Sequence, residues 1–400
     1  MRRSLLFVVA LIACGPSDET AAPSEDTGGE VLFAWVTDSD SVDLNFVAIV
    51  DADRESDAYG QVLRTLPVPT SGRTRGHHTE HSMPEGGYLF ANDFGTGKTY
   101  VLDLGDPLRP GVADSFQVAG PLASPHSFER LPNGNVLATF QNEGSGNQAA
   151  GGLAELDPTG VAIRWGMAAD GDRYIRPYSL APVPQIDRVV SGSADMRGQG
   201  DSHVVQVWRL SDLTLLHTVD LPAEWGPAAE PRVLSDGETV LVTTFGCKLL
   251  RVVDLAGREP TAEVVFDFGG RSCALPVVVG DYWIQAVPEA HGLVALDVSD
   301  PSAPREVSRV TLDDDDWPHW ISLAPDQRRI VVTGYAGTRH RVVLVDLDPS
   351  TARMSVDVDF NDGSGRPGIT FDRGTWPHGS TGPGDPHGVV FSRPSSGGGL

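Results

Sequence analysis

The chain has 400 residues, among them 45 glycines and 30 prolines, and a formal net charge of -24 at pH 7. Such an acidic surface repels phosphate backbones, which argues against nucleic-acid binding. Beyond the N-terminus there is no apolar run of about twenty residues, so no further membrane-spanning helix is expected. Glycine and proline mixed with valine, leucine and threonine, without long helical periodicity, predict an all-β chain of short strands and turns.

Residues 1–13 have the pattern of a signal peptide. Arg2 and Arg3 precede an apolar core, and Leu11-Ile12-Ala13-Cys14 resembles a bacterial lipobox, where a signal peptidase cleaves before a lipidated cysteine. The pattern predicts a lipoprotein signal peptide over residues 1–13, lipidation of Cys14 and a disordered tether over residues 14–30. An ordinary signal peptide is the alternative. We expect an exported, lipid-anchored protein of the cell envelope that touches a membrane only through its N-terminal lipid.

Three apolar segments follow, residues 31–37, 46–51 and 61–67, and we predict them as strands. A phrase of four short strands then recurs six times, and one last strand is predicted over residues 388–392. Equivalent positions in the successive copies and in the last strand are His78, His126, Tyr178, Arg232, Cys273, His319 and His387. A four-stranded repeat of roughly 50 residues is typical of a β-propeller blade.

Six complete blades leave three strands at the N-terminal end and one at the C-terminal end. Together these make a seventh blade, and pairing the last strand with the first three closes the ring and hides the sheet edges. We therefore predict a single seven-bladed β-propeller over residues 31–392, closed in this way, and a disordered tail over residues 393–400.

Four histidines, His78, His126, His319 and His387, occupy one position of this repeat. The first strand of each blade lines the central channel of a propeller, and the four blades concerned are neighbours in a closed ring. Their imidazoles are therefore expected to converge on one ion, because neutral imidazole nitrogen binds zinc, copper, iron or nickel at about 2.0–2.2 Å. His77 is an alternative to His78. The competing interpretation is a strand-entry motif whose rings only pack beneath the channel mouth.

Other polar residues are expected near this mouth. Glu80 and Glu230 are candidates to accept hydrogen bonds from ligand imidazoles, or else they are solvated. Cys247 and Cys273 are predicted to lie close enough for a disulfide, the common arrangement in an exported protein, and a redox-active Cys273 beside the metal is the alternative. His81 is expected to point away from the ligands, because its odd spacing changes faces in a straight strand.

A series of short motifs runs along the chain in a fixed order. They are Tyr59-Gly60-Gln61-Val62, Leu66-Pro67-Val68-Pro69, His77-His78, Ser124-Pro125-His126, Leu131-Pro132-Asn133-Gly134, Trp317-Pro318-His319 and the C-terminal His387. In this order they resemble the selenium-binding protein/methanethiol oxidase family over about residues 31–392. The resemblance implies a propeller-like fold and, in bacterial members, a periplasmic copper enzyme that oxidises methanethiol with O2 and water to formaldehyde, hydrogen sulfide and hydrogen peroxide. It also implies copper ligands at His77, His78, His126 and His387.

One segment departs from that family. A cysteine-rich Cys-x-x-Cys segment typically follows the paired histidines, and Thr79-Glu80-His81-Ser82-Met83 stands there instead. The departure argues against selenium binding through this segment and leaves room for a different substrate.

We therefore hypothesise an exported oxidase of a small thiol or related sulfur compound that uses copper, or else zinc or another transition metal. The predicted metal ligands are His77, His78, His126, His319 and His387. Glu80 or Cys273 is the candidate proton shuttle. The alternative is a non-catalytic propeller scaffold that binds a metal or ligand, since a fold does not fix a function. A lactonase-like hydrolase fits less well, because it would use carboxylate and asparagine ligands for calcium.

Overall fold

A computed structural model of the chain describes residues 29–70, 74–144, 149–196 and 203–393. The predicted signal peptide, Cys14 and nearly all of the predicted tether lie outside these residues. The described part is all-β, as predicted, with three short 3-10 helices: η1 (Pro184–Ile186), η2 (Ala223–Trp225) and η3 (Pro288–Ala290). No helix in these residues has the length and apolar character needed to cross a membrane.

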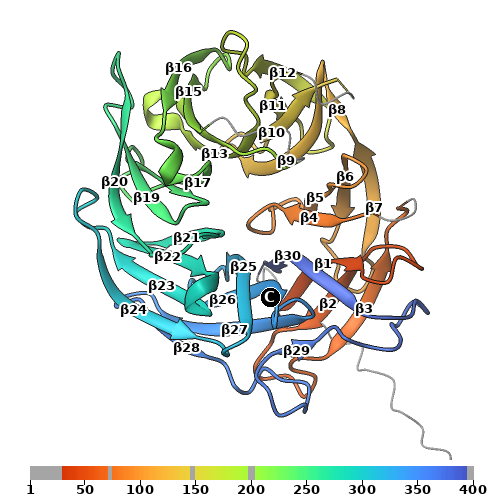
Figure 1. Cartoon of the computed structure of the whole chain (residues 1–400). Helices are drawn as coiled ribbons and strands as arrows, with labels where there is room; N and C mark the ends of the chain where they lie inside the picture. The colour runs from red at the N-terminus through yellow and green to blue at the C-terminus, as the bar shows by residue number, and fades with distance from the viewer. Residues whose placement is uncertain (1–28, 71–73, 145–148, 197–202, 394–400) are drawn as a thin grey trace, which may run out of the picture.

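Within the described residues the strands form six antiparallel sheets arranged around a common centre (Figure 1). One has the order β3-β2-β1-β30, with β1 (Val31–Asp38), β2 (Phe46–Asp51), β3 (Val62–Pro67) and β30 (Gly384–Phe391). The next has the order β4-β5-β6-β7, with β4 (Gly76–Thr79), β5 (Tyr88–Asp93), β6 (Lys98–Asp103) and β7 (Gly111–Phe116). The third has the order β12-β11-β10-β9-β8, with β8 (Val118–Ala119), β9 (Leu122–Arg130), β10 (Val136–Glu143), β11 (Gly152–Leu156) and β12 (Ala162–Met167).

The fourth sheet has eight strands. They are β13 (Pro177–Val183), β14 (Arg188–Ser193), β15 (Val204–Arg209), β16 (Leu215–Asp220), β17 (Ala228–Val233), β18 (Val240–Thr244), β19 (Lys248–Val253) and β20 (Thr261–Asp267). Its two halves, β13 to β16 and β17 to β20, are joined where Ser193 of β14 lies opposite Ala228 of β17.

Two further sheets complete the described fold. One contains β21 (Pro276–Val279), β22 (Tyr282–Val287), β23 (Gly292–Asp297) and β24 (Arg305–Thr311). The other contains β25 (Asp316–Leu323), β26 (Arg329–Ala336), β27 (Arg341–Asp348) and β28 (Arg353–Val356), and β29 (Ile369–Thr370) also pairs with β27. The short strands β8 and β29 were not predicted from the sequence, because two residues carry no recognisable alternation.

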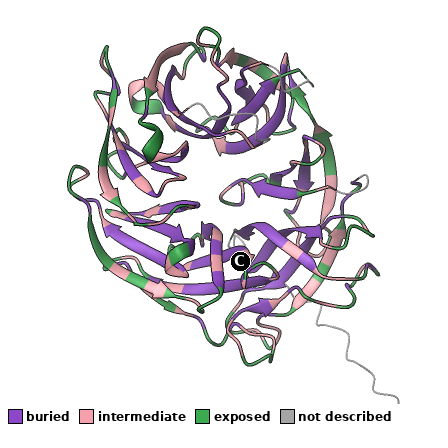
Figure 2. Cartoon of the chain, in the orientation of Figure 1, coloured by how far each residue is buried: buried purple, intermediate pink, exposed green. Residues whose placement is uncertain are grey.

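Burial decreases from the centre of the molecule to its rim (Figure 2). Every residue of β2 is buried, which explains its continuous apolar sequence, because both of its faces pack against other parts of the protein. The rim strand β24 is mostly exposed, and five of its seven residues are charged or polar. Strand β30 pairs with β1, with Leu32 opposite Phe391, so one sheet contains both ends of the described chain.

Candidate metal centre

His77 and His78 are neighbours in β4, yet both face the centre of the molecule. Successive residues of a regular strand point to opposite faces. Here the pairing register between β4 and β5 shifts between Gly76 and Thr79, so that β4 carries one extra residue. This β-bulge turns both imidazoles the same way, and their rings stack with centroids 4.1 Å apart and an interplanar angle of 6°.

The same irregularity recurs in other inner strands, at the residues that face the centre. Register shifts enclose His126 in β9, Tyr178 in β13, His319 in β25 and His387 in β30. Bulges redirect side chains and are frequent next to active sites. The repeated histidine position of the sequence therefore coincides with a repeated break in strand pairing.

The strand that pairs with the inner strand of each repeat, such as β5 beside β4, is its second strand. Buried polar side chains of these second strands form hydrogen bonds with the backbone groups that the bulges leave unpaired. The Oδ1 atom of Asn92 accepts the backbone N–H of His78 at 2.7 Å, and its Nδ2 donates to the carbonyl oxygen of His126 at 2.9 Å. Thr333 donates its hydroxyl to the carbonyl oxygen of His387 at 2.6 Å. Because a buried backbone group without a partner is costly, these bonds hold the histidine-bearing segments in place.

These supporting residues were not predicted, although the sequence carries a signal for them. In six of the second strands, a buried polar residue occupies an equivalent position within a largely apolar segment. The six are Asn92, Thr139, Ser191, Thr243, Gln285 and Thr333.

Four imidazoles converge at the centre: His77, His78, His319 and His387 each offer a ring nitrogen within 4.8 Å of the others. The ring centroids of His77 and His387 are 4.4 Å apart, and those of His319 and His387 are 4.9 Å apart. Nitrogens that share one metal ion at about 2.0–2.1 Å lie within about 4 Å of one another. Small side-chain adjustments would therefore bring all four into one coordination shell. The structure brings together four of the five predicted ligands.

His126, the fifth predicted ligand, lies against these four without being one of them. Its ring centroid is 4.5 Å from that of His78 and 5.1 Å from that of His77. Its Nδ1 lies 2.7 Å from the carbonyl oxygen of Tyr178. Because a carbonyl oxygen can only accept, Nδ1 carries the proton and Nε2 keeps its lone pair. A backbone carbonyl thus orients this ring, as one often does for a metal-binding histidine.

These five residues form the histidine group, in which each imidazole keeps one buried nitrogen without a hydrogen-bond partner among the described residues. The atoms are Nδ1 of His77 and Nε2 of His78, His126, His319 and His387. Leaving five polar atoms buried and unpaired costs free energy unless a ligand satisfies them.

Burial is the main cause that lowers the pKa of every imidazole in the histidine group. It lowers the pKa of His126 to about 4 and that of His319 to about 3. The pKa values of His77, His78 and His387 also fall well below the usual value, because neighbouring imidazoles add to the effect of burial. The rings are therefore neutral at pH 7, which is the form that binds transition metals.

Two cavities reach the histidine group. The smaller, about 280 Å³, is lined by His77 and His319 together with Tyr178, Phe245, Trp317 and Tyr335. The larger, about 470 Å³, is lined by His387, Arg75, Tyr335 and several polar residues. The first cavity is small and aromatic, which suits a ligand of a few non-hydrogen atoms.

Glu80 does not face the imidazoles, in contrast to the prediction. Both of its carboxylate oxygens contact Arg130, at 2.6 and 3.0 Å, and one of them accepts the backbone N–H of Phe90 at 2.9 Å. A buried carboxylate needs such partners, and the neighbouring strand β9 supplies the arginine. The structure thus places the carboxylate of Glu80 against Arg130, and neither against an imidazole nor in solvent.

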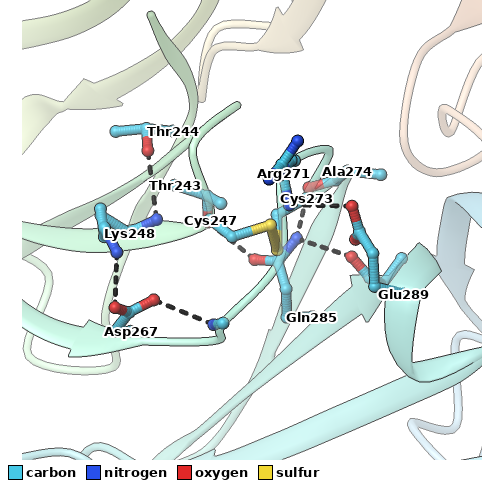
Figure 3. The surroundings of a disulfide bond; sticks show 12 residues. Thr243, Thr244, Cys247, Lys248, Asp267, Arg271, Cys273, Ala274, Gln285 and Glu289 are labelled. Atoms are coloured by element: carbon cyan, nitrogen blue, oxygen red, sulfur yellow. Dashed lines mark hydrogen bonds and ion pairs between the residues drawn. A yellow bond between two sulfur atoms is a disulfide. The ribbon is translucent and has the colours of Figure 1, made fainter. Parts of the chain in front are cut away.

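Cys247 and Cys273 form a disulfide bond, with Cα atoms 4.9 Å apart (Figure 3). Both cysteines are fully buried. Gln285, on the neighbouring strand β22, donates a hydrogen bond to the carbonyl oxygen of Ala274 beside the bridge. Of the two predicted arrangements, the structure contains the disulfide and no free Cys273 thiol.

His81, Glu129, Glu230 and Arg232 form a second polar assembly, the charged cluster. The Nε2 atom of His81 is 3.3 Å from Nη2 of Arg232 and 3.8 Å from Oε1 of Glu129. Arg232 donates from Nη1 to Glu230 at 3.0 Å. Burial raises the pKa of Glu129 to about 7, although Arg232 opposes this effect. His81 thus lies apart from the ligand atoms, and Glu230 bonds Arg232 rather than an imidazole.

The relatives found by sequence comparison and described below are all methanethiol oxidases. No family model matches the chain. It is 28% identical to a methanethiol oxidase from Hyphomicrobium over 174 residues, which cover 40% of this chain and 38% of that protein. It is 23% identical to the methanethiol oxidase of Xenopus laevis over 52% of this chain and 50% of that protein. It is 22% identical to the methanethiol oxidase of Danio rerio over 70% of this chain and 66% of that protein. The chain therefore matches less than two thirds of each relative's length.

Solved structures agree on the fold. A hypothetical selenium-binding protein from Sulfolobus tokodaii superposes with a TM-score of 0.72 at 15% identity, covering 90% of this chain and 93% of that one. A periplasmic gluconolactonase from Pseudomonas aeruginosa gives 0.60 at 12% identity, covering 91% and 99%. The structural likeness supports a propeller fold, and the sequence matches confirm the resemblance to methanethiol oxidases that the motifs indicated.

Proposed function

We propose that this protein is a metal-dependent oxidase of a small thiol, with copper held by the histidine group. The observation that carries the proposal is the set of five neutral imidazoles beside a small aromatic cavity, each with one buried nitrogen that has no hydrogen-bond partner among the described residues. The similarity to methanethiol oxidases points to the same reaction class. In that reaction methanethiol, O2 and water yield formaldehyde, hydrogen sulfide and hydrogen peroxide.

The donor set suits a transition metal. His77, His78, His319 and His387 would hold the ion and His126 would stand beside it as a fifth imidazole. Imidazole suits copper, zinc, iron and nickel, and O2 chemistry favours copper among the predicted metals. A bound copper ion would supply a Lewis acid for the thiol sulfur and a one-electron couple for O2.

The protein's own residues position the reactants. Tyr178, Phe245 and Trp317 give the cavity an apolar wall that can hold an alkyl group and limit water. Met196 lines the same cavity and offers a polarisable contact to a sulfur compound. The carbonyl of Tyr178 keeps the proton of His126 on Nδ1, so this ring presents a lone pair to the centre.

We propose a seven-bladed ring for the fold. The eight-stranded sheet counts as two blades because one residue pair joins its halves, and the pairing of β30 with β1 supports closure. A variant that ends at residue 383 lacks β30 and is expected to lose cooperative thermal unfolding. A native-like transition in that variant would contradict the closure.

Export and lipid anchoring are also proposed. The lipobox around Cys14 supports them, and the buried disulfide suits an oxidising compartment. Metabolic labelling with palmitate should mark the wild type, and Cys14→Ser should abolish the label. A labelled Cys14→Ser variant, or an unlabelled wild type, would contradict the anchor.

The experiment that tests the function combines metal analysis with oxygen uptake. The purified protein should bind copper and consume O2 in the presence of methanethiol, while His319→Ala should lose both properties. His217→Ala is the matched control, because His217 lies on the outer strand β16, away from the histidine group. Bound copper without turnover of any small thiol would instead favour a metal-binding scaffold, and absence of copper from the wild type would remove the proposed centre.

A further inference from the structure

Tyr335 separates the two cavities that reach the histidine group. Its side chain lines both the aromatic cavity and the larger polar cavity. Its ring centroid lies 4.9 Å from that of His319 and 5.8 Å from that of His387. A ligand whose sulfur atom lies at the histidine group would therefore extend along the side chain of Tyr335.

Arg75, which directly precedes β4, contacts the same tyrosine. Its Nη2 donates a hydrogen bond to the hydroxyl oxygen of Tyr335 at 2.9 Å, and its guanidinium carbon lies 5.8 Å from the ring centroid. Arg75 forms no ion pair with any residue that the structure describes, and its side chain is exposed. Its charge contributes to the low pKa of His77, His319 and His387, which agrees with its position above the histidine group.

The carboxylates that line the cavity of Arg75 are engaged elsewhere. Asp385 pairs with Arg339 at 2.8 Å and with His340 at 2.8 Å, and Asp38 accepts a backbone N–H at 2.9 Å. Among the described residues the aromatic cavity has no carboxylate in its lining. Among the described residues, Arg75 is thus a cation in the lining of the larger cavity that no carboxylate contacts at ion-pair distance.

We infer that Arg75 and Tyr335 form an anion-binding subsite beside the histidine group, and that the preferred ligand is a short thiol carrying a carboxylate, such as mercaptoacetate. This inference rests on the proposed function for the fate of the sulfur. The guanidinium is suited to carboxylates because it offers two parallel N–H donors, and the tyrosine hydroxyl fixes its orientation. The thiol would point to the histidines and the carboxylate to Arg75.

The reaction keeps the stoichiometry of the methanethiol reaction. A carbon–hydrogen bond and the carbon–sulfur bond of the α-carbon break, and a carbonyl group forms with oxygen from water. Sulfur leaves as hydrogen sulfide, and the two electrons removed from carbon reduce O2 to hydrogen peroxide. Mercaptoacetate, O2 and water thus yield glyoxylate, hydrogen sulfide and hydrogen peroxide.

The kinetic test compares a charged with a neutral thiol. In the copper-loaded wild type we expect a higher kcat/KM for mercaptoacetate than for ethanethiol. Arg75→Gln should lower the ratio of the two values roughly tenfold to a hundredfold, the range expected for a lost hydrogen bond to a charged group. Arg75→Lys keeps the charge without the two parallel donors and should restore only part of the ratio, and Arg64→Gln, on the exposed face of β3, should leave it unchanged.

A binding test on the metal-free protein separates this inference from the proposed function. The thioether (methylthio)acetate, which has a carboxylate but no thiol hydrogen, should bind the wild type in calorimetry. It should bind Arg75→Gln at least tenfold more weakly. If no thiol is oxidised but this binding depends on Arg75, the anion subsite stands and the oxidase proposal fails. If thiols are oxidised with a ratio that Arg75→Gln does not change, the subsite is wrong and the oxidase proposal stands.

Discussion

The histidine group and the charged cluster take residues from two shared stretches of the chain but differ in the contacts that their side chains make. His78 and His126 belong to the first, and three residues further along, His81 and Glu129 belong to the second. The imidazoles of the histidine group keep unpartnered nitrogens, whereas His81 stacks on Trp320 at 5.1 Å and faces charged partners. Residue type therefore does not identify a binding site. A convergence of several unpartnered nitrogens on one centre does, whereas a single unpartnered atom among the described residues, such as Oε1 of Glu230, does not.

The largest effect on copper binding is expected when a histidine is removed from the histidine group, and none is expected when one is removed from the charged cluster. His387→Ala should weaken copper binding by at least about 100-fold, because a direct ligand matters more than a supporting contact, whose loss costs roughly 10–100-fold. His81→Ala should bind copper like the wild type. Competition against a chelator of known affinity measures both values. Equal affinity in all three proteins would erase the distinction between the two assemblies.

Removing the cation of the charged cluster should act on stability instead. Arg232→Leu leaves Glu230, whose side chain is 2% exposed, without its ion-pair partner. The expected loss is about 3 kcal/mol in the free energy of unfolding, as for other broken buried pairs. Urea denaturation measures it, with Arg309→Leu as the control on the exposed strand β24, where the expected loss is below about 1 kcal/mol. A normal stability together with lost copper would show that the cluster is part of the centre.

The disulfide provides a reference outside both assemblies. Replacing Cys247 and Cys273 together by alanine should lower the free energy of unfolding by about 2–3 kcal/mol, because the bridge closes a loop across a sequence separation of 26. Copper binding and thiol oxidation should not change, since Cys273 has no thiol. If oxidation fell while copper stayed bound, Cys273 would regain the redox role that the structure denies it.

A smaller, pH-dependent effect is expected from Glu129. Burial raises its pKa from the usual 4.5 to about 7, so between those pH values the folded protein holds a proton that the unfolded chain has released. Its contribution to stability is therefore present below about pH 4.5 and is lost as the pH rises to about 7. Glu129→Gln cannot titrate and should gain about 1–2 kcal/mol relative to the wild type between pH 5 and pH 8. Parallel stability curves for the two proteins would contradict this.

Much of the fold was predictable because the sequence repeats itself. The phrase that contains His126 and the one that contains His319 share a register, so each could be assigned an inner strand and a place facing the centre. The β-strand content and the proximity of Cys247 and Cys273 followed from the same register. Short apolar strands separated by turn residues gave most element positions, because the second strand of each repeat is largely apolar.

The rest could not be predicted, because bulges and cross-strand partners leave little trace in a single sequence. Alternation alone cannot place His77 and His78 on one side, and only the extra residue in β4 does so. Glu80 follows these histidines closely, yet Arg130 of the neighbouring strand determines its direction. The acceptor for His126 is a backbone carbonyl, which no residue type announces.

X-ray absorption spectroscopy of the protein loaded with one equivalent of copper tests the central claim most directly. We predict that nitrogen atoms at about 2.0 Å surround the metal, with the multiple-scattering pattern of at least three imidazoles. A spectrum dominated by sulfur or by oxygen without imidazole, or a protein that retains no copper, would contradict the proposal that the histidine group is a metal centre.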